Sequence, residues 1–419
     1  MSFHLLQGFF TGSCGLFLSC RVSRYHSYLN AAKEILSLYK GKEPFTSFIK
    51  KYFAEHKKSG SRDRKEIRNL CYCYFRASPP SKGGISKPLI PDELQLLKNL
   101  FLCSTEPNEI LASLKPKWND MIKLSLNEKL SSVNYKLSSV FPWTEELSYG
   151  IEYEEFCASF FVQPDLFLRI RPGQAEKVLL KLNAAAINYE FISPFSIRLP
   201  NSFKADEYFE LDAEVVVQDY NSQRVGEIVF AGQTGTFRPG ESYRVWDCCA
   251  GSGGKSIMAY DLNPAIDLVV SDVRESVLAN LKKRFGKAGI KKYKSFVADL
   301  EHSPLAIQHL PFNLIIADVP CSGSGTWGRT PEQLVYFDTG KIDVYAAMQK
   351  NIVTNVIPHL RPGGNLLYIT CSVFKKENEE VVEFIKEKFR LQLMKMELLK
   401  GYDKKADTMF AALLSLPVR

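Results

Sequence analysis

The chain of 419 residues lacks the cysteine patterns that hold a metal ion or build a disulfide framework. None of its ten cysteines forms a C-x-x-C pair, and no set of cysteines and histidines has the spacing of a zinc site. Cys71 and Cys73 are separated by one residue, and Cys248 and Cys249 are adjacent. Such free thiols are typical of a reducing compartment, so we expect a cytoplasmic protein with no bound metal.

The sequence also lacks a hydrophobic run that could cross a membrane, which would need about 20 apolar residues. The N-terminal stretch is uncharged, but polar residues such as Gln7 interrupt it. We therefore expect residues 1–24 to be an apolar leader that need not be structured, and we expect no membrane partner. A transit peptide is the alternative, because Arg21 and Arg24 precede the first acidic residue, Glu34.

Acidic residues are scarce in the first third of the chain. Residues 1–140 contain 22 Lys and Arg but 11 Asp and Glu, a net charge of +11, whereas the whole chain carries +8. The remaining residues therefore carry a net charge of −3. A basic first part joined to a nearly neutral remainder suggests a module that binds a polyanion, although a solvated charged surface would give the same composition.

The hydrophobic pattern indicates three domains after the leader. Residues 25–140 place apolar side chains such as Leu29 and Leu36 at helical spacing and are expected to form an all-helical domain. Residues 141–238 combine a helix with short strands in a small α+β segment. In residues 239–419 strands alternate with helices, which predicts an α/β domain with an open parallel sheet. Its expected strands are 243–247, 267–272, 295–298, 312–318 and 365–370.

A glycine-rich turn follows the first of these strands, and glycines there let a ligand approach the backbone closely. Residues 249–254 read Cys-Ala-Gly-Ser-Gly-Gly, and Lys255 follows them. Cys249 stands where a phosphate-binding G-x-x-x-x-G-K-[ST] loop needs glycine, and Ser256 stands where G-x-G-x-x-G needs one. A nucleoside triphosphate or a dinucleotide is therefore not the expected ligand.

Acidic residues lie at the ends of the neighbouring strands. Asp272 ends the second expected strand, where a carboxylate can accept hydrogen bonds from both ribose hydroxyls of a nucleoside. Asp299 follows the third strand, in reach of an adenine amino group, and Asp318 ends the fourth. One such acid alone is better explained as a cap or turn residue. Together with the glycines they favour an adenosine ligand without a phosphate tail, S-adenosyl-L-methionine. The residues expected to bind this cofactor are Cys249, Ala250, Gly251, Ser252, Gly253, Gly254, Lys255, Asp272, Asp299 and Asp318.

Three motifs in this order resemble the RsmB/NOP family of S-adenosylmethionine-dependent RNA cytosine-C5 methyltransferases. They are D-x-x-A-x-x-G-G-K-S at 247–256, D-x-P-C-S-G-x-G at 318–325, and Y-x-T-C-S at 368–372, the last followed by Glu377-Asn378-Glu379. The resemblance implies a Rossmann-like class I methyltransferase domain that methylates a specific cytosine in RNA.

Shorter segments extend the resemblance to about residues 155–415. They are V-Q-D at 217–219 with Ser222-Gln223, and A-D-T-M-F-A-A at 406–412. Two positions depart from the family's usual pattern: Gly251-Ser252 stands where Ala-Pro is usual, and Gly328-Arg329 stands where an Arg pair is usual.

Residues 27–77 more loosely resemble the helical NusB-type RNA-binding domain that precedes the catalytic part in some members of the family. The segments that carry this resemblance are S-R-D-R at 61–64 and Y-F-R at 74–76.

The resemblance also implies the catalytic roles. Cys371 would add to C6 of the cytosine, because a covalent adduct turns the poorly nucleophilic C5 into an enamine carbon. Cys321 would assist elimination and product release. Asp318 would contact both cofactor and base, and Lys255 would orient the base or favour a thiolate.

The resemblance implies RNA as the partner, with 16S ribosomal RNA as the expected substrate and transfer RNA as an open alternative. A monomer is expected. An amino-group methyltransferase would have Asn/Asp-Pro-Pro-aromatic at the fourth strand, which Val319-Pro320-Cys321 does not match. A non-catalytic RNA-binding assembly factor with a vestigial fold is the alternative from another functional class.

Overall fold

The computed structural model describes the whole chain except residues 1–11, 81–90, 231–242, 304–310 and 419. The described residues divide into two compact units, each assembled from segments that are distant in sequence. The expected boundary at residues 238–239 lies outside the described residues, as does the first half of the expected leader. The helical unit consists of Met1–Pro142, Phe160–Val162 and Thr330–Asp338, and the α/β unit of Trp143–Ser159, Gln163–Arg329 and Thr339–Arg419.

The helical unit forms from short amphipathic helices, several of which begin at a side-chain cap. The side chains of Asp92, Asn108 and Ser125 each accept a hydrogen bond from a backbone N–H of the first helical turn. Described elements of this unit are α1 (Gly12–Leu38), α2 (Phe45–Glu55), α3 (Ser61–Arg76), α4 (Glu93–Cys103), α5 (Glu109–Leu114), α6 (Pro116–Asp120), α7 (Leu126–Ser132), the 3₁₀ turn η2 (Leu137–Ser139) and α13 (Pro331–Tyr336).

The core of the helical unit contains the periodic apolar residues of the sequence, among them Leu29 and Leu36, both fully buried. It also contains Tyr74 and Phe75, which lie near the end of α3. Arg76 is buried as well, and its guanidinium donates to the backbone carbonyl of Phe160 at 3.2 Å. The end of α3 therefore serves the interior of this unit, whereas its first turns carry the exposed basic side chains.

Helix α13 comes from the stretch between two strands of the α/β unit, yet it packs within the helical unit. The Tyr336 hydroxyl donates to the backbone carbonyl of Tyr39 at 2.9 Å, and the two rings meet edge to face. A carboxylate oxygen of Glu332 accepts the first backbone N–H of α2, from Phe45, at 3.2 Å. The expected third domain, residues 239–419, thus contributes one segment to the helical unit.

The α/β unit is built on a seven-stranded sheet in the order β10-β11-β9-β8-β5-β6-β7. Strands β5 to β9 are parallel, as expected, whereas β11 pairs antiparallel with both of its neighbours, β9 and β10. The sheet is therefore mixed rather than purely parallel. Its strands are β5 (Tyr243–Asp247), β6 (Ile266–Asp272), β7 (Tyr293–Val297), β8 (Phe312–Asp318), β9 (Leu360–Thr370), β10 (Gln392–Leu399) and β11 (Met409–Ser415).

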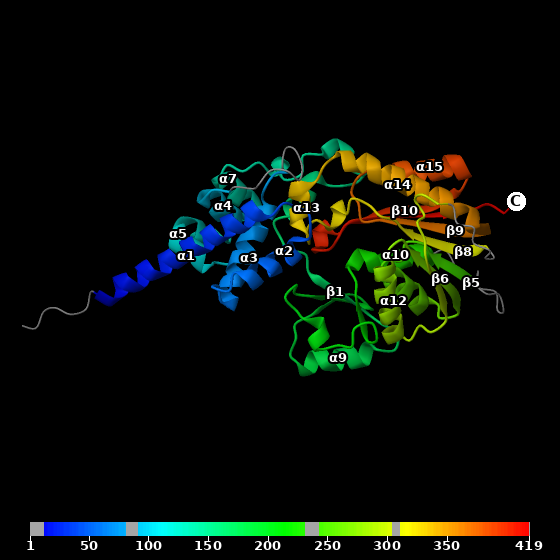
Figure 1. Ribbon diagram of the computed structural model, residues 1–419, viewed down its shortest axis with the longest axis horizontal. Helices are drawn as coiled ribbons and strands as arrows, with labels where there is room; N and C mark the ends of the chain where they lie inside the picture. The colour runs from blue at the N-terminus through cyan, green and yellow to red at the C-terminus, as the bar shows by residue number, and fades with distance from the viewer. Residues whose placement is uncertain (1–11, 81–90, 231–242, 304–310, 419) are drawn as a thin grey trace, which may run out of the picture. The chain divides into compact units, whose positions relative to one another are not determined.

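Helices cover both faces of this sheet (Figure 1). One buried apolar cluster joins alternate strand residues to helices α10, α11 and α12, and a second joins the opposite face to α14 and α15. This three-layer arrangement is the Rossmann-like fold class expected from the sequence. The helices are α10 (Tyr220–Phe230), α11 (Gly254–Leu262), α12 (Glu275–Ala288), α14 (Gly340–Val356) and α15 (Glu379–Phe389), with 3₁₀ turns η5 (Ser324–Thr326), η6 (Ile357–His359) and η7 (Tyr402–Lys404).

A second, four-stranded sheet in the same unit has the order β2-β3-β1-β4. The expected strand at 192–199 is instead a hairpin of two strands, because Pro194-Phe195 forms a turn. One face of this sheet packs on α9 through an apolar cluster. The elements are η3 (Thr144–Glu146), α8 (Tyr153–Ser159), β1 (Leu166–Ile170), α9 (Ala175–Ala184), β2 (Glu190–Ser193), β3 (Ser196–Leu199), η4 (Ala205–Glu207) and β4 (Val215–Val217).

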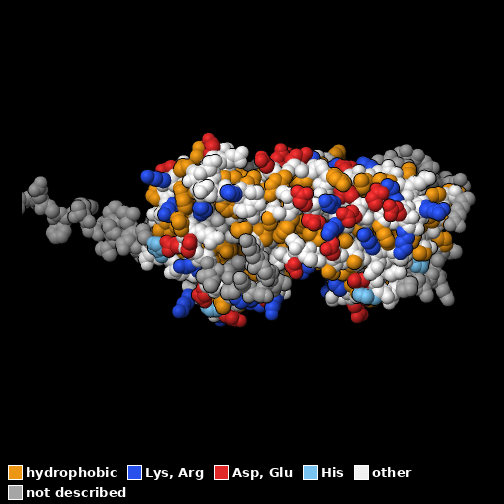
Figure 2. Space-filling view, turned by 90° about the horizontal axis from the view of Figure 1, so that it is seen from above, with side chains coloured by type: hydrophobic (Ala, Val, Ile, Leu, Met, Phe, Trp, Pro, Cys, Tyr) orange, Lys and Arg blue, Asp and Glu red, His pale blue; other side chains and the backbone are white. Residues whose placement is uncertain are grey.

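On the face seen in Figure 2, Lys and Arg side chains are interspersed with Asp and Glu side chains among the described residues. Within the described ranges, no helix is both long and apolar enough to span a membrane. No group of three or more His, Cys, Asp or Glu side chains in those ranges could hold a metal ion.

We expect Asp261→Ala to destabilise the α/β unit, because this buried carboxylate joins helix α11 to the end of strand β1. Arg169 Nη1 lies 2.6 Å from Asp261 Oδ2, and Arg171 also pairs with Asp261. The substitution leaves two nearly buried guanidinium groups without their anion, a loss of about 3–5 kcal/mol in the free energy of unfolding. Urea unfolding should show the loss. Glu207→Ala, which removes an exposed pair with Lys204, is the control and should leave the unfolding curve unchanged.

Candidate active site

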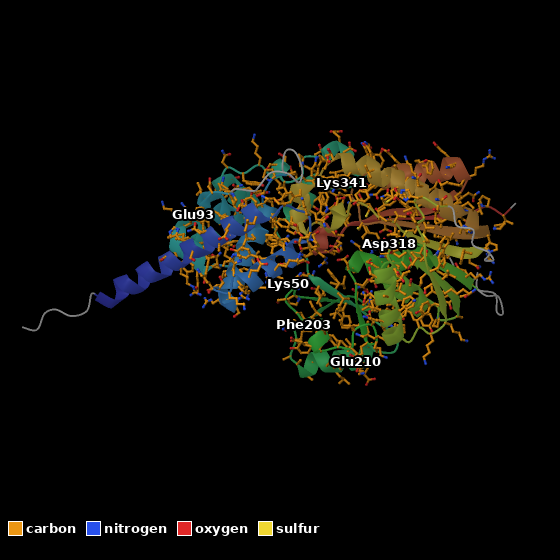
Figure 3. All side chains as sticks on the ribbon, viewed as in Figure 1. Lys50, Glu93, Phe203, Glu210, Asp318 and Lys341 are labelled. Atoms are coloured by element: carbon orange, nitrogen blue, oxygen red, sulfur yellow. The ribbon has the colours of Figure 1, made fainter. Side chains whose placement is uncertain are left out.

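The expected site residues gather at the carboxyl ends of the central parallel strands. The first strand in sequence, β5, lies between β8 and β6, so the strand order reverses at the β5–β8 pair. Open α/β sheets bind their ligands in the crevice at such a reversal. Asp318, labelled in Figure 3, is the last residue of β8 and lies at this end of the sheet.

Two cysteines that are 50 residues apart in sequence meet at this edge. Cys321 follows β8, Cys371 follows β9, and their sulfur atoms are 3.3 Å apart, within hydrogen-bond distance. Both side chains are partly buried. The hydrogen bond to Cys371, together with burial, raises the pKa of Cys321 well above its usual value. Cys321 is therefore a thiol at neutral pH, and its S–H can donate to the sulfur of Cys371.

The loops that follow β8 and β9 carry Cys321 and Cys371 and are called the cysteine loops below. A lysine and an aspartate lie beside them. Lys255, the second residue of α11, donates from Nζ to Asp318 Oδ2 at 3.0 Å and to Ser222 Oγ at 2.7 Å. The lysine side chain is 8% exposed, and its ammonium group forms an ion pair with the Asp318 carboxylate. In these contacts Lys255 engages Asp318 rather than a thiol. Ser222 was not among the expected site residues, although its segment contributed to the resemblance.

The glycine-rich turn, residues 249–254, leaves its backbone accessible. Gly251 has a φ of +52° and Gly253 a φ of +86°, conformations that favour glycine. A Cβ on Gly251 would have no atom within 4 Å, whereas a Cβ on Gly253 would lie 2.8 Å from the ring of Phe285. Gly253 therefore permits close packing of helix α12, and Gly251 presents an open edge.

Asp272 holds this turn from the end of β6. Its Oδ2 accepts the backbone N–H of Gly251 at 3.0 Å, and its Oδ1 accepts that of Arg274 at 2.9 Å. Asp299 has a different environment, because β7 ends at Val297 and Asp299 lies in the following turn. Its carboxylate accepts the backbone N–H groups of residues 301 and 302 and contacts the His302 ring. The contacts of Asp299 are thus within its own turn.

Asp247, at the end of β5, is a fully buried carboxyl group. Its Oδ2 accepts the Ser256 hydroxyl at 2.6 Å, and its Oδ1 has no hydrogen-bond partner among the described residues. Burial raises the pKa of Asp247 to about 7, with a smaller contribution from the negative charge of Asp318. An unpartnered, buried acceptor beside the glycine-rich turn is unusual in a folded protein and suggests a ligand nearby.

Comparison with known proteins identifies the part of the chain that carries this site. Residues 235–416 match the family described as 16S rRNA methyltransferase RsmB/F. These residues are therefore similar to the methyltransferase domain of that family. The family expected from the three motifs is thereby confirmed over the region in which they lie.

Relatives and solved structures agree with this assignment. The chain is 30% identical over 171 residues to ribosomal RNA small subunit methyltransferase B of Xanthomonas campestris, covering 41% of this chain and 37% of that protein. It is 26% identical over 247 residues to the probable ribosomal RNA small subunit methyltransferase B of Bacillus subtilis, covering 57% and 54%. The matches thus span about half or less of these relatives' length.

Two crystal structures show the same fold. That of PH0851 aligns with a TM-score of 0.65 at 20% identity and covers 91% of this chain and 98% of that one. A methyltransferase homologue from Pyrococcus horikoshii aligns with a TM-score of 0.54 at 18% identity and covers 69% and 98%.

Arg329, which belongs to one of the two departures from the usual pattern, makes several tertiary contacts. The guanidinium donates to Asp219 Oδ2 at 2.7 Å, to Asp407 Oδ1 at 2.8 Å and to the backbone carbonyl of Asp165 at 2.9 Å. Burial raises the pKa of Asp407 to about 7, and the nearby Asp219 adds to this rise. One arginine thus joins the two short segments, around 219 and 407, that extended the resemblance.

A second departure, at Gly251-Ser252, is also supported by a tertiary contact. Arg284 of α12 donates to the backbone carbonyl and to the hydroxyl of Ser252, both at 3.0 Å. The same guanidinium pairs with Asp212 at 2.6 Å. Arg284 therefore links the turn that carries Ser252 to helix α12 and to Asp212.

We expect Gly325→Ala to disrupt the cysteine loops. The backbone N–H of Gly325 donates to the Cys371 carbonyl, and its carbonyl accepts from Thr408, both at 2.9 Å. A Cβ there would lie 2.0 Å from the Thr408 carbonyl oxygen, so the backbone must move. The free energy of unfolding should fall by about 1–3 kcal/mol.

The matched control for this substitution is Gly286→Ala, in the last turn of α12. A Cβ at Gly286 would meet no atom within 4 Å. That change should raise the free energy of unfolding by about 0.5–1 kcal/mol, because alanine is the better helix former. Both variants are compared with the wild type by urea unfolding. If the Gly325→Ala protein is as stable as the wild type, Gly325 does not lie as close to the Thr408 carbonyl as described.

Proposed function

We propose that this protein is an RNA cytosine-C5 methyltransferase that uses S-adenosyl-L-methionine and methylates a specific cytosine in 16S ribosomal RNA. The observation that carries the proposal is the pair of sulfur atoms, 3.3 Å apart, beside the Lys255–Asp318 pair. The family matched by residues 235–416, described as a 16S rRNA methyltransferase, supports the choice of RNA. The names of the two bacterial relatives support it too.

The residues around the glycine-rich turn fit the cofactor. Within the part of the chain that the structure describes, Asp247 offers a buried oxygen without a hydrogen-bond partner, and a Cβ at Gly251 or Gly254 would face open space. We assign cofactor binding to the turn at 249–254 with Lys255, and to the carboxylates of Asp272, Asp299 and Asp318. S-adenosylmethionine supplies a methyl group on a sulfonium sulfur that a carbon nucleophile can attack.

The protein's own groups then prepare the cytosine. The Cys371 sulfur forms a bond to C6, which makes C5 the nucleophile for the methyl group. Asp318 faces the base and favours protonation at N3 as C6 is attacked, while Lys255 holds Asp318 in place. After the transfer, water takes the proton from C5, the C5–C6 double bond re-forms, and the C6–sulfur bond breaks. We assign Cys321 to this elimination, because its thiol, adjacent to Cys371, can give a proton to the departing sulfur.

We further propose that the helical unit is the NusB-type RNA-binding domain. The net charge of +11 in residues 1–140 supports binding to a polyanion. Exposed basic residues at the start of α3, such as Arg62 and Arg68, would contact RNA phosphates. Arg62 pairs with Glu109, so part of this charge is compensated within the unit.

The two cysteines should give opposite results when each is replaced by alanine. Cys371→Ala should abolish methyl transfer to RNA and form no covalent adduct, because the bond to C6 cannot form. Cys321→Ala should accumulate an RNA–protein adduct on a denaturing gel, because elimination is blocked. Cys103→Ala, which changes a cysteine of the helical unit, should behave as the wild type.

Two further results distinguish the proposed enzyme from a non-catalytic RNA-binding assembly factor. The absence of an adduct with Cys321→Ala would contradict the role of that cysteine. If calorimetry shows no binding of S-adenosylmethionine to the wild type, the protein is a scaffold for RNA assembly rather than an enzyme.

The RNA target can be read from a deletion strain. Bisulfite sequencing of total RNA should show one cytosine of 16S ribosomal RNA that loses its methyl group when the gene is removed. Loss of methylation in a transfer RNA instead would move the substrate to that class while leaving the chemistry unchanged.

A further inference from the structure

A buried glutamate lies directly behind the two cysteine loops. Glu377 follows strand β9 and precedes helix α15, and none of its surface is exposed. It belongs to the Glu-Asn-Glu segment that contributed to the family resemblance, but the proposed chemistry gives it no role. Among the described residues, no Lys, Arg or His forms an ion pair with it. Its carboxylate is instead held by neutral donors.

These donors come from both cysteine loops. Glu377 Oε2 accepts the backbone N–H of Ser322 at 2.8 Å, and Ser322 is the residue after Cys321. Glu377 Oε1 accepts the hydroxyl of Ser372 at 2.8 Å, and Ser372 is the residue after Cys371. One carboxylate therefore binds the immediate neighbour of each cysteine.

A third donor closes the arrangement. Gln349 of helix α14 donates from Nε2 to Glu377 Oε2 and to the backbone carbonyl of Pro320, both at 3.0 Å. The hydroxyl oxygens of Ser322, Ser324 and Ser372 lie 3.1–3.2 Å from one another. The two loops are thus joined by a buried polar network in which Glu377 supplies the negative charge.

Burial makes this arrangement sensitive to loss of the carboxylate. Burial raises the pKa of Glu377, and its three hydrogen bonds oppose that rise. If the carboxylate is removed, the Ser322 N–H and the Gln349 amide lose an acceptor in a site that water does not reach. The loops then have to move to find new partners.

We propose that Glu377 is a positioning residue that fixes the distance between the Cys321 and Cys371 sulfur atoms. Its effect on catalysis rests on the proposed function, because it acts through the step assigned to Cys321. Without Glu377 the two loops lose their shared anchor, so Cys321 no longer lies beside the adduct when elimination must occur. Addition at C6 needs Cys371 alone and is affected less.

The distance between the sulfurs can be measured without any RNA. Diamide, a diazene oxidant, removes two electrons and two protons from a pair of adjacent thiols and leaves a disulfide. Wild-type protein should form the Cys321–Cys371 disulfide readily, as seen by mass spectrometry of peptides. Glu377→Ala should form it about tenfold more slowly, because a shift of roughly 1 Å can cost that much in rate.

Glu379→Ala is the matched control. Glu379 is also a buried glutamate whose pKa burial raises, but it bonds to the Ser148 hydroxyl and the Tyr149 N–H, outside the cysteine loops. The Glu379→Ala protein should form the Cys321–Cys371 disulfide at the wild-type rate. Glu377→Gln keeps an acceptor for the Ser322 N–H and should recover most of the rate.

The second part of the experiment measures catalysis through the amount of covalent RNA–protein adduct. Glu377→Ala should accumulate a covalent RNA adduct, as expected for Cys321→Ala, while its affinity for S-adenosylmethionine stays unchanged. A general loss of structure would instead lower both the amount of adduct and the affinity for S-adenosylmethionine. If Glu377→Ala does not fold, Ser372→Ala, which removes one of the three hydrogen bonds, takes its place in both parts.

Two outcomes overturn the inference. One is a folded Glu377→Ala protein that forms the disulfide at the wild-type rate, and the other is an equal slowing in Glu379→Ala. Failure of the proposed function gives a different result, since wild-type protein would then transfer no methyl group to RNA while the difference in disulfide formation remained.

Discussion

The candidate site depends on the parallel pairing of β8 with β9. Asp318 lies opposite Ile369 in this register, and the backbone N–H of Val319 donates to the Ile369 carbonyl at 3.1 Å. The two strands therefore end side by side, and the loops that follow them carry Cys321 and Cys371. A shift of one residue would turn the side chains at these ends to the opposite face of the sheet. The adjacency of the two sulfurs is thus a consequence of strand register.

Register alone leaves the loops free to separate beyond the strand ends. The close approach of Gly325 to the Cys371 and Thr408 carbonyls removes that freedom on one side, and the carboxylate of Glu377 removes it on the other. Burying a carboxylate without a cation is costly, and native structures tolerate this only where hydrogen bonds compensate. The network behind the cysteines supplies those bonds, which explains why the segment around Glu377 is so polar although it is buried.

The smaller sheet supports the glycine-rich turn of the same site. Asp261 on α11 pairs with Arg169 and Arg171 from the β1 region, and Arg284 connects Asp212 with Ser252. These contacts fasten the glycine-rich turn and the start of α11, which carries Lys255. The α+β segment is therefore part of the scaffold of the candidate site, with both sheets in one compact unit.

Local patterns in the amino-acid sequence were enough to predict the α/β fold class, the methyltransferase family and most strands of the large sheet. Strand β8 begins and ends where expected, at Phe312 and Asp318, because a short, mostly apolar run that ends in Asp just before Pro320 is typical of a buried strand. The antiparallel pairing of β11 with β9 and β10 had no local signal, and neither did the placement of α13 in the helical unit. Both are decided by partners that are distant in sequence.

The same division holds for the site. Motifs indicated that Cys321, Cys371, Asp318 and Lys255 belong together, because their residue types and order suit one reaction. Which atoms meet was decided only by tertiary structure: Lys255 pairs with Asp318 and Ser222, and Asp299 bonds within its own turn. The position of Glu377 behind both cysteines is also tertiary, since hydrogen bonds across 55 residues of sequence leave no periodicity or spacing to read.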